Sequence, residues 1–573
     1  MSLSEWWQKA VFYQIYPRSF ADGNGDGMGD FAGMVQKLDY LQSLGVDAVW
    51  LSPHYPSPFV DCGYDISDYE GIAPEYGDMA TFKKFLDGLH ERGMRLILDL
   101  VLNHTSDKHP WFLESRSSLD NPKRDWYVWK KGREGNPPTD WYSTFGGSAW
   151  ELDPITGEYY YHFFFKEQPD LNWNNPAVKQ AMFDMVRFWL EIGVDGFRLD
   201  AVGTIFEDEH YFNHNEKRSL KELIQLELTI KSLEERADLS ETYKKVFQYQ
   251  HDMPGVHDLM RELRQVVNEY DHRVLVGETD DLSFYGTGKD ELDLVFNFPL
   301  METTQQLTPK FIHDNQKARL SQMPASAWPC NTFGNHDSPR CYSHFGDGRH
   351  NSLQARQLIT LLLTLKGTPF LYNGEEIGMS DYLLQSPAQF RDPLSREYAL
   401  VIQELQRLSE KEATHFGAER GRDKCRTPMQ WNNEANAGFC PDGVSPWLPI
   451  NPDYRQGVNV AEEISNENSL LSFYRKLLAL RKSAGTLQTG DFEELPEMPP
   501  EVYAFRRFDE NGEFLTLLNY SEAEVSFPLP SDFVENHCLI LEGNAHQWSE
   551  VAGTAHLTGW GCVILQKIQL PKN

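Results

Sequence analysis

Short apolar stretches alternate with amphipathic helical segments along most of the chain. Eight of these stretches have the length and the β-branched or aromatic content of buried strands. They cover residues 11–16, 46–52, 95–102, 194–199, 273–276, 292–298, 332–334 and 368–372. Helical periodicity separates successive stretches, for example at 34–44, 80–92 and 178–192. Strands that alternate with helices favour a parallel sheet, and eight such units predict an α/β fold, the (β/α)8 TIM barrel.

Three segments between these units are too long to be simple connections. Residues 105–174, after the third predicted strand, are rich in Trp, Tyr, Pro and Gly and predict an inserted small domain. Residues 203–256 are charged and helical in pattern, and residues 380–457 follow the eighth predicted strand. We expect all three to surround one rim of the barrel and to deepen its pocket. The predicted barrel then comprises residues 1–104 and 175–485.

The last part of the chain, residues 486–573, has a different pattern. A predicted helix over 470–483 closes the barrel, and five alternating stretches with polar turns follow it. These stretches cover residues 502–508, 514–519, 524–527, 538–541 and 562–565. Alternation of apolar and polar positions is typical of half-buried antiparallel strands. We therefore expect a C-terminal antiparallel β-sandwich domain that packs against the barrel.

Polar side chains follow the predicted barrel strands at their C-terminal ends. They are Asp99, Asn103, His104, Arg198, Asp200, Glu278, His336, Asp337, Glu375 and Glu376. Catalytic residues of TIM barrels lie at this end of the strands. The sequence therefore predicts that carboxylates far apart in the chain converge on one rim.

Arg198 and Asp200 end the fourth predicted strand. Residues i and i+2 of a strand point to the same side. Arg198 can therefore hold Asp200 ionised, as a nucleophile or charge stabiliser requires. Taken alone, the pair is equally well explained as a structural ion pair at the end of a strand.

Glu278 and Asp337 follow two further strands. A carboxyl group that ends an apolar strand lies where burial favours its protonated form, which a general acid needs. Three carboxylates from three strands, many aromatic residues and no Ser or Cys nucleophile motif indicate glycoside chemistry. Any one of the three alone can be structural.

The formal net charge is −32 and the pI is near 4.9. Nucleic acids and anionic membranes bind positively charged surfaces, so we expect neither as a partner. Seven scattered cysteines without a CxxC pair predict a reduced compartment. The N-terminus lacks the basic and apolar regions of a signal peptide, and the longest apolar run, near 358–365, is too short to span a bilayer. We expect a soluble, cytoplasmic protein without an organic cofactor; the sequence leaves its oligomeric state open.

An acidic, glycine-rich loop follows the first predicted strand. Oxygen-bearing side chains at its positions 1, 3, 5 and 9, Gly at position 6 and a backbone carbonyl at position 7 match a calcium loop. This pattern predicts a structural Ca²⁺ bound by Asp22, Asn24, Asp26, Met28 and Asp30. The bidentate Glu of an EF-hand is missing, because Gly stands at position 12. A plain acidic turn is the alternative.

Seven short motifs lie in order between residues 14 and 431. They are Gln14-Ile-Tyr-Pro-Arg-Ser-Phe20, Asp61-Cys-Gly-Tyr-Asp-Ile66, Asp99-Leu-Val-Leu-Asn-His104, Gly196-Phe-Arg-Leu-Asp200, Gly277-Glu-Thr279, Gly334-Asn-His-Asp337 and Arg426-Thr-Pro-Met-Gln-Trp431. This ordered set resembles the α-amylase superfamily (glycoside hydrolase family 13), in its α-glucosidase and oligo-1,6-glucosidase branch. It covers nearly the whole chain up to the C-terminal β-domain.

The resemblance implies a role for each catalytic carboxylate. Asp200 would be the nucleophile, Glu278 the acid/base and Asp337 the stabiliser of the transition state. Arg198 would orient Asp200. The 105–174 insertion would correspond to the B-type domain of the family.

The resemblance also implies a pocket for the non-reducing glucose. His104 and His336 would hydrogen-bond this glucose, and Tyr64 would stack on it. Asp61 and Arg422 would hold its far hydroxyls and close the pocket, as in exo-acting members. Arg426 lies four residues after Arg422, so the sequence leaves open which arginine lines the pocket. The acidic loop would be the calcium or magnesium site of this branch.

The implied activity is that of a retaining exo-α-glucosidase acting on short, maltose-like or sucrose-like α-glucosides, with transglucosylation where a hydroxyl compound replaces water. Ala201 resembles α-1,4-preferring members, since those that cleave α-1,6 bonds tend to carry Val there. An α-glucosyltransferase or glucoside isomerase with the same triad is the first alternative. A non-catalytic binding or transporter-associated subunit is the second, although such relatives lose triad carboxylates and carry a membrane anchor.

The chain departs from the family pattern at two places. The segment between Asp200 and Glu278 is longer than in typical bacterial members, which puts the shape of the acceptor side in doubt. Asn373 stands where Gln is usual.

Overall fold

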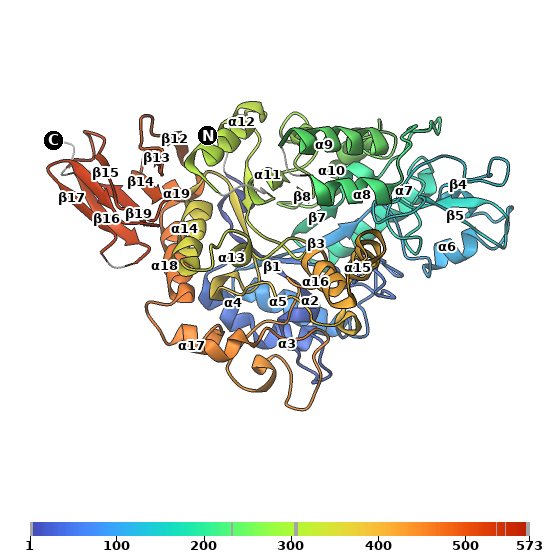
Figure 1. Cartoon of the computed structure of the whole chain (residues 1–573), viewed down its shortest axis with the longest axis horizontal. Helices are drawn as coiled ribbons and strands as arrows, with labels where there is room; N and C mark the ends of the chain where they lie inside the picture. Colours follow the sequence, from blue (N-terminus) through green and yellow to red (C-terminus); the bar gives the residue numbers. More distant parts are fainter. Residues whose placement is uncertain (1–3, 231–232, 303–306, 535, 545, 569–573) are drawn as a thin grey trace.

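The computed structural model describes residues 4–230, 233–302, 307–534, 536–544 and 546–568. Eight parallel strands form its central sheet (Figure 1). They are β1 (Phe12–Ile15), β2 (Ala48–Leu51), β3 (Arg95–Val101), β7 (Gly196–Asp200), β8 (Val274–Gly277), β9 (Leu294–Val295), β10 (Cys330–Thr332) and β11 (Thr368–Tyr372). They hydrogen-bond in the order β10-β11-β1-β2-β3-β7-β8-β9. Each predicted barrel strand overlaps one of them, and the predicted fold class is confirmed.

The barrel is nearly closed. In the described part of the chain, β9 pairs with β8 and β10 pairs with β11. The side-chain amides of Asn297 and Asn331 bridge the remaining gap with a 3.1 Å hydrogen bond. Arg319 donates to the carbonyl oxygens of Val295 and Phe296 at 2.5 and 2.7 Å. The two Arg319 bonds satisfy backbone carbonyl groups that would otherwise need a neighbouring strand as partner.

Both faces of the barrel strands are buried, which explains their continuous apolar runs. One set of side chains, including Phe12, Trp50 and Phe370, fills the barrel interior. The other set, including Tyr13 and Val49, packs under the surrounding helices. A strand buried on both faces gives no alternating pattern, so its ends are hard to predict from sequence.

Helices begin and end at residues that satisfy their free backbone groups. Asp78 caps α5 (Met79–Glu91) by accepting from Thr81 N–H. Asn175 caps α7 (Pro176–Ile192), which ends at Gly193 in the left-handed conformation. The predicted helix over 34–44 is in fact two helices, α3 (Phe31–Gln36) and α4 (Leu38–Leu44), because Lys37 leaves the helical conformation.

The segment between β3 and β7 carries its own antiparallel sheet. Its strands are β4 (Trp129–Lys130), β5 (Trp150–Leu152) and β6 (Tyr159–Tyr161), in the order β4-β6-β5. Trp141, Trp150 and Tyr161 form a small core of their own. This is the predicted inserted small domain, and it lies at the opposite end of the molecule from the C-terminal strands (Figure 1).

The other two insertions are mainly helical and meet each other. The insertion after β7 contains α8 (Leu220–Thr229) and α9 (Leu233–Phe247). The insertion after β11 contains α15 (Pro393–Gln406) and α16 (Glu410–Arg420). Helix α15 contacts both α16 and α8.

Two antiparallel sheets form the C-terminal part, as predicted. One has the order β12-β13-β14-β19-β16 and the other β15-β18-β17. Their bounds are β12 (Asp491–Glu494), β13 (Val502–Asp509), β14 (Gly512–Asn519), β15 (Val525–Pro528), β16 (His537–Glu542), β17 (Trp548–Val551), β18 (Thr554–Leu557) and β19 (Cys562–Lys567). Strands β12, β17 and β18 were not predicted from the sequence, since they are short and partly exposed.

Helix α14 (Asn351–Thr364) contacts β14 and β19 of the C-terminal sheets, and α18 (Leu470–Ser483) packs against α14 (Figure 1). The buried Arg507 of β13 donates to the carbonyl oxygens of Thr364 and Leu365 at 2.9 and 2.8 Å, at the end of α14. No helix in the described part of the chain is both long and apolar enough to cross a bilayer.

Candidate active site

One guanidinium nitrogen of Arg198, in strand β7, donates to two carboxylates. Its Nη1 donates to Asp200 Oδ1 and to Asp99 Oδ1, each at 2.6 Å. The guanidinium is almost fully buried, whereas Asp200 at the end of the strand is partly exposed. The sequence therefore correctly placed Arg198 and Asp200 on one side of β7, and Asp200 at the barrel rim.

Glu278 follows strand β8 and turns toward the same guanidinium. Its Oε1 lies 2.8 Å from Arg198 Nη2, and its Oε2 accepts the backbone N–H of Ala201 at 2.9 Å. This bond requires an unusual backbone, since Ala201 lies in the left-handed region at φ 42°, ψ 48°. One arginine thus joins the two carboxylates predicted to act as nucleophile and acid/base.

Asp200 and Glu278 are electrostatically coupled. Burial and the charge of Glu278 raise the pKa of Asp200 well above its usual range, while Arg198 opposes this. Both side chains contact the Arg198 guanidinium, which offsets the repulsion between their like charges.

Asp337 lies among cationic groups on the other side of the site. Its Oδ1 contacts Nη2 of the buried Arg426 and lies 3.5 Å from Arg422 Nη1. Its Oδ2 lies 3.3 Å from His336 Nε2. Burial alone would raise the pKa of Asp337, but the Arg426 and Arg422 guanidinium groups oppose this and hold that pKa below its usual range; His336 adds to their effect only while its ring is protonated. Asp337 is therefore a carboxylate at neutral pH.

Arg422 pairs with Asp61, as predicted, and also with a residue that the sequence analysis did not name. Its Nη2 donates to Asp61 Oδ1 at 2.7 Å and to Asp392 Oδ1 at 2.8 Å. The side chain of Arg422 is 13% exposed and that of Arg426 is fully covered. Both arginines reach Asp337, and Arg422 is the one with surface toward the pocket.

Tyr64 and His336 connect the two sides of the site. His336 Nε2 lies 2.5 Å from Tyr64 Oη, which donates to Asp99 Oδ2 at 3.2 Å. The Tyr64 and His336 rings stack with centroids 5.5 Å apart. Gln14 Nε2 lies 2.8 Å from His336 Nδ1, which assigns the ring proton to Nε2. Burial lowers the pKa of His336 to about 3, so this ring is neutral.

His104 is neutral as well, because burial lowers its pKa to about 3. Gln168 Nε2 lies 2.9 Å from His104 Nε2 and donates to Asp61 Oδ2 at 3.1 Å. The ring of Phe164 packs edge-on against His104 at 5.1 Å. Neutral imidazoles, an amide and an aromatic wall suit a neutral, hydroxyl-rich ligand such as a sugar.

The C-terminal end of the inserted segment contacts this pocket. Asn103 Nδ2 donates to Asp170 Oδ2 at 3.0 Å, and a backbone bridge links His104 to Asp170. Gln168 lies two residues before Asp170. The insertion therefore returns to the end of β3 and places an amide next to the predicted glucose-binding residues.

All predicted catalytic and substrate-binding residues come together in the structure. The three triad side chains open to solvent, at 11% exposed for Asp200, 24% for Glu278 and 31% for Asp337. Four further residues contact the predicted site residues and were not predicted from the sequence: Gln168, Asp392, Phe145 and Phe164. They lie in loops or insertions, where no periodic pattern marks them.

The residues predicted to bind calcium form one tightly hydrogen-bonded loop. Asp22 accepts from two glycine N–H groups of this loop at 2.6 and 2.8 Å. Asn24 accepts from Asp26 N–H and Asp26 from Met28 N–H, each at 2.9 Å. The buried Asp30 accepts from three N–H groups, one of which, that of Gly33, lies in the first turn of α3. Carboxylate and amide oxygens suit a hard cation such as Ca²⁺. Several of these oxygens already accept hydrogen bonds within the loop.

The loop packs closely against the insertion that follows β11. Trp447 N–H donates to Gly27 O at 2.9 Å. Gly27 has φ 93°, and a Cβ there would lie 2.2 Å from Ser445 O. Glycine at loop position 6 is therefore required by both conformation and space.

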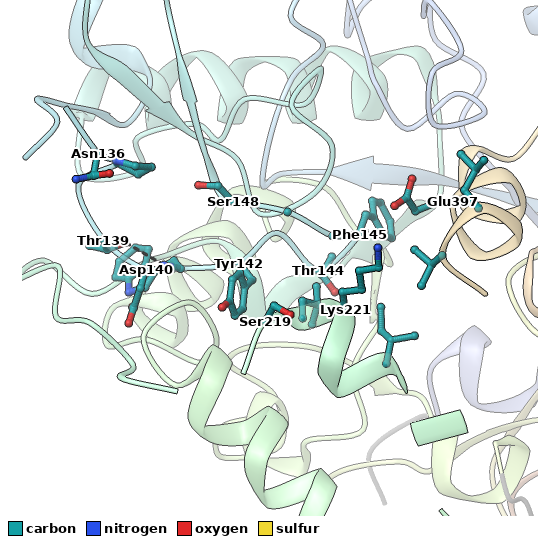
Figure 2. A pocket seen from close by; sticks show the side chains of 18 of the residues that line it. Asn136, Thr139, Asp140, Tyr142, Thr144, Phe145, Ser148, Ser219, Lys221 and Glu397 are labelled. Atoms are coloured by element: carbon teal, nitrogen blue, oxygen red, sulfur yellow. Dashed lines mark hydrogen bonds between the residues drawn. The ribbon is translucent and has the colours of Figure 1, made fainter. Parts of the chain in front are cut away.

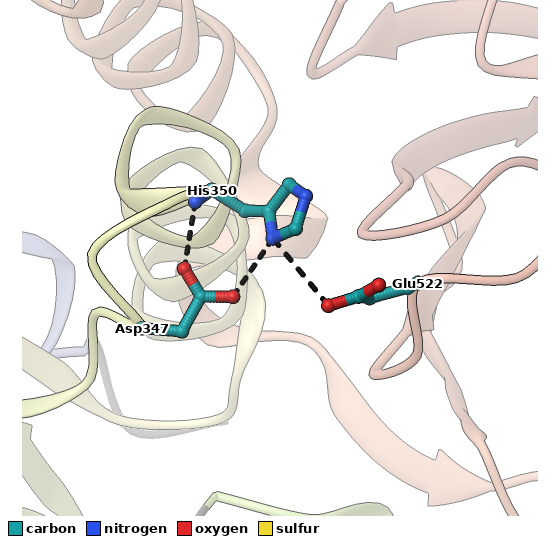
Figure 3. A group of neighbouring side chains, drawn as sticks. All are labelled: Asp347, His350 and Glu522. Atoms are coloured by element: carbon teal, nitrogen blue, oxygen red, sulfur yellow. Dashed lines mark hydrogen bonds and ion pairs between the residues drawn. The ribbon is translucent and has the colours of Figure 1, made fainter.

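A second group of candidate metal ligands lies between the barrel and the C-terminal sheets (Figure 3). Among the described residues, Asp347, His350 and Glu522 offer ligand atoms within 4.8 Å of one another. His350 Nδ1 lies 2.8 Å from Asp347 Oδ2 and 3.9 Å from Glu522 Oε1. The group is largely exposed, and we interpret it as an ion-pair contact that joins α14 to the β14–β15 loop.

Comparison with known proteins agrees with this geometry. The catalytic-domain profile of α-amylase matches residues 14–490. The oligo-1,6-glucosidase of Parageobacillus thermoglucosidasius is 39% identical over 551 residues, which cover 92% of this chain and 93% of that protein. The α-glucosidase of Pediococcus pentosaceus is 38% identical over 540 residues, covering 90% of this chain and 91% of that protein.

A solved structure extends the comparison to three dimensions. The trehalulose synthase of Pseudomonas mesoacidophila MX-45 matches with a TM-score of 0.86 and 37% identity, covering 98% of this chain and 99% of that one. The resemblance inferred from the seven motifs is confirmed. The chain belongs to the family of the α-amylase catalytic domain.

Proposed function

We propose that this glycoside hydrolase is a retaining exo-α-glucosidase acting on short α-glucosides. The observation that carries the proposal is the bridge from Arg198 to both Asp200 and Glu278, with the ionised Asp337 on the other side of the pocket. Retaining glycosidases need a nucleophile and an acid/base placed close together. The salt-bridged Asp61 and Arg422 limit the pocket to one terminal glucose.

The reaction proceeds in two displacement steps at the anomeric carbon. Asp200 forms a bond to the anomeric carbon while the glycosidic bond breaks, and Glu278 gives its proton to the leaving oxygen. A water molecule then loses a proton to Glu278 and attacks the anomeric carbon, which breaks the bond to Asp200. Two inversions return the α configuration. The retaining route predicts a separation of about 5–5.5 Å between the two carboxyl groups.

Proton NMR of the first product tests this proposal. With sucrose, whose only glucose unit is the glucosyl residue that is cleaved, we expect α-glucose to form before mutarotation produces the β anomer. Initial formation of β-glucose would contradict the retaining mechanism. Failure to release glucose from any α-glucoside would contradict the proposed activity.

The alternative is glucosyl transfer or isomerisation with the same triad. The structural match to a trehalulose synthase supports it. Product analysis with sucrose distinguishes the two: a hydrolase gives free glucose and fructose in equal amounts, whereas an isomerase gives a new disaccharide. We expect free monosaccharides to dominate.

Replacing Ala201 with Val should shift the linkage preference toward α-1,6 bonds. Ala201 directly follows Asp200, and its backbone N–H donates to Glu278, so a larger side chain at this position changes the surroundings of both carboxyl groups. We expect the ratio of kcat/KM for isomaltose to that for maltose to rise about tenfold, the scale of one or two methyl groups in a binding site. Ala201→Gly, which tolerates the left-handed conformation, is the control and should not raise this ratio.

We further propose that the loop from Asp22 to Asp30 binds a structural Ca²⁺. Treatment with a chelator should lower Tm by a few degrees, and added Ca²⁺ should restore it, because a ligand that binds only the folded state stabilises it. Magnesium serves as the comparison ion. Asp26→Ala removes an exposed ligand and should abolish the response. A wild-type Tm that is the same with chelator and with Ca²⁺ would rule the site out.

We also propose a cytoplasmic location. All seven cysteines are free thiols in the structure, and six of them are buried. This state suits a reducing compartment. Fractionation of cells that express the protein tests the location.

A further inference from the structure

Two cavities outside the catalytic triad differ in the charge of their walls. The first, of about 1320 Å³, lies between the three insertions. Figure 2 shows Asn136 and Thr139 at one end of it and Glu397 at the other. Carboxylates outnumber cationic side chains four to two along this wall, and one of the cations, Lys221, already pairs with Glu404. The first cavity therefore offers an anion no excess of positive charge.

The second cavity, of about 560 Å³, lies at the opposite end of the barrel strands. Five of its lining residues come shortly before the strands β1, β8, β9, β10 and β11. They are Trp7, Arg273, Asp293, Trp328 and Lys366. Catalytic residues of a TIM barrel lie at the other, C-terminal end of the strands. The second cavity is therefore separate from the active site.

Cationic side chains outnumber carboxylates along the wall of the second cavity. Four arginine and lysine side chains line it, against two carboxylates: Arg264, Arg273, Lys289, Lys366, Glu5 and Asp293. The whole chain has a formal net charge of −32, so this cavity differs in sign from most of the molecule. A cavity lined mainly by cations attracts anions.

The two carboxylates of this wall already have partners. Arg264 Nη1 donates to Asp293 Oδ2 at 2.5 Å. His272 Nδ1 lies 3.0 Å from Glu5 Oε2. Among the described residues, the other three cationic side chains of the wall pair with neither carboxylate.

Two of these three cations, Arg273 and Lys289, form no ion pair with any carboxylate that the structure describes. Arg273 Nη1 donates to the carbonyl oxygen of Asp271 at 2.8 Å, while its buried Nε has no hydrogen-bond partner in the described protein. The buried indole N–H of Trp328 also lacks one. Buried donors without an acceptor are rare in folded proteins, and a bound anion would supply acceptors.

Aromatic rings complete the wall. Trp7, Tyr270 and Trp328 line the cavity, and Lys366 Nζ lies 5.7 Å from the centre of the Trp328 ring. Lys366 also lies 3.4 Å from the exposed Asp491, a contact that solvent screens. Rings beside cations suit a ligand that joins a charged group to a flat body. The volume is in the range of small-molecule sites.

The cavity lies across the open seam of the barrel. Strands β9 and β10 stand at the two ends of the strand order and do not pair with each other in the described structure. Arg273 and Lys289 lie on the β8–β9 side of the seam, and Trp328 and Lys366 on the β10–β11 side. A ligand that contacts both sides would link the two edges.

We propose that this cavity binds a multiply charged anion of the phosphate class, which contacts Arg273 and Lys289 on one side of the seam and Lys366 on the other. Guanidinium and ammonium groups form charge-assisted hydrogen bonds to phosphate oxygens. Inorganic phosphate and the phosphate group of a nucleotide share this chemistry, and the aromatic rings favour the nucleotide. The site is separate from the triad, so the inference does not depend on the proposed glycosidase function.

Thermal unfolding with inorganic phosphate or with AMP tests the proposal. At constant ionic strength, adjusted with NaCl, we expect Tm to rise by about 2 °C at about 100 times Kd, because the ligand binds only the folded state. Isothermal titration calorimetry measures Kd and separates binding from the general stabilising effect of salts. A lower Kd for AMP than for phosphate would assign a contribution to the aromatic wall, and equal values would identify the free anion as the ligand.

Arg273→Gln/Lys289→Gln should raise the Kd for phosphate about tenfold or more, since it removes two charge-assisted contacts. Lys289→Gln alone changes only an exposed side chain, and it should weaken binding without changing the Tm of the free protein. Arg187→Gln/Lys244→Gln is the matched control. It removes the same two charges from surface ion pairs that do not line the cavity, and it should keep the wild-type Kd.

Two results would overturn the inference. One is a wild-type protein that binds neither phosphate nor AMP, and the other is a wild-type Kd in Arg273→Gln/Lys289→Gln. Neither result bears on the hydrolysis of α-glucosides, which is measured separately.

Discussion

Asp200→Asn should lower kcat by about 10⁴-fold or more, with little change in Tm, because the amide cannot form the covalent intermediate. Asn has nearly the same size and shape as Asp, so the variant leaves no cavity next to Arg198. Arg198 also keeps its bond to Asp99 in the variant. Steady-state kinetics and thermal unfolding measure the two effects.

Azide rescue makes this result specific for a nucleophile. In Asp200→Gly, azide can enter the vacated space and attack the anomeric carbon of an activated α-glucoside. One inversion gives β-glucosyl azide. Asp184→Asn, on the exposed face of α7, is the matched control and should retain wild-type activity. Activity of Asp200→Asn within tenfold of wild type would refute the assignment.

Arg198→Met should lower kcat/KM by about 10²- to 10⁴-fold and move the acid limb of the pH profile to higher pH. Arg198 lowers the pKa of both Asp200 and Asp99. Without it, both pKa values rise. Asp200 must be ionised to attack, so the active fraction at a given pH falls and the limb moves upward.

Arg187→Met is the control for loss of an arginine. Arg187 pairs with Glu269 and Asp184 on the surface, and its replacement should change neither the rate nor the pH profile. Arg198→Met should also be less stable at neutral pH than at pH 5, because the carboxyl groups around Arg198 lose their counter-charge and protonation relieves it. An acid limb that stays in place would show that Arg198 does not control the ionisation of Asp200.

The barrel could be predicted from the sequence because its strands are buried on both faces. Their uninterrupted apolar runs mark each strand, but not its ends. β10 (Cys330–Thr332) begins two residues before the predicted stretch at 332–334. The polar Asn331 within β10 interrupts the apolar pattern that marks a buried strand. β12 was missed because its acidic, half-exposed sequence has no β pattern and is held by pairing with β13.

The convergence of the three carboxylates on one rim could be predicted because the end of a barrel strand is a fixed position in the fold. The supporting residues could not be predicted in the same way. Gln168 contacts Asp61 and His104 only because the inserted segment folds back to the end of β3. Asp392 meets Arg422 from a loop 30 residues away in sequence. Such contacts depend on the paths of long loops, which local sequence patterns do not describe.

The return of the inserted segment to the end of β3 limits how this protein can be recombined with its relatives. Gln168 and Asp170 lie in the insertion, yet they hold His104, Asp61 and Asn103 of the barrel. A chimaera that exchanged the insertion would exchange part of the sugar pocket with it. A donor segment can therefore function here only if it brings matching partners for the barrel.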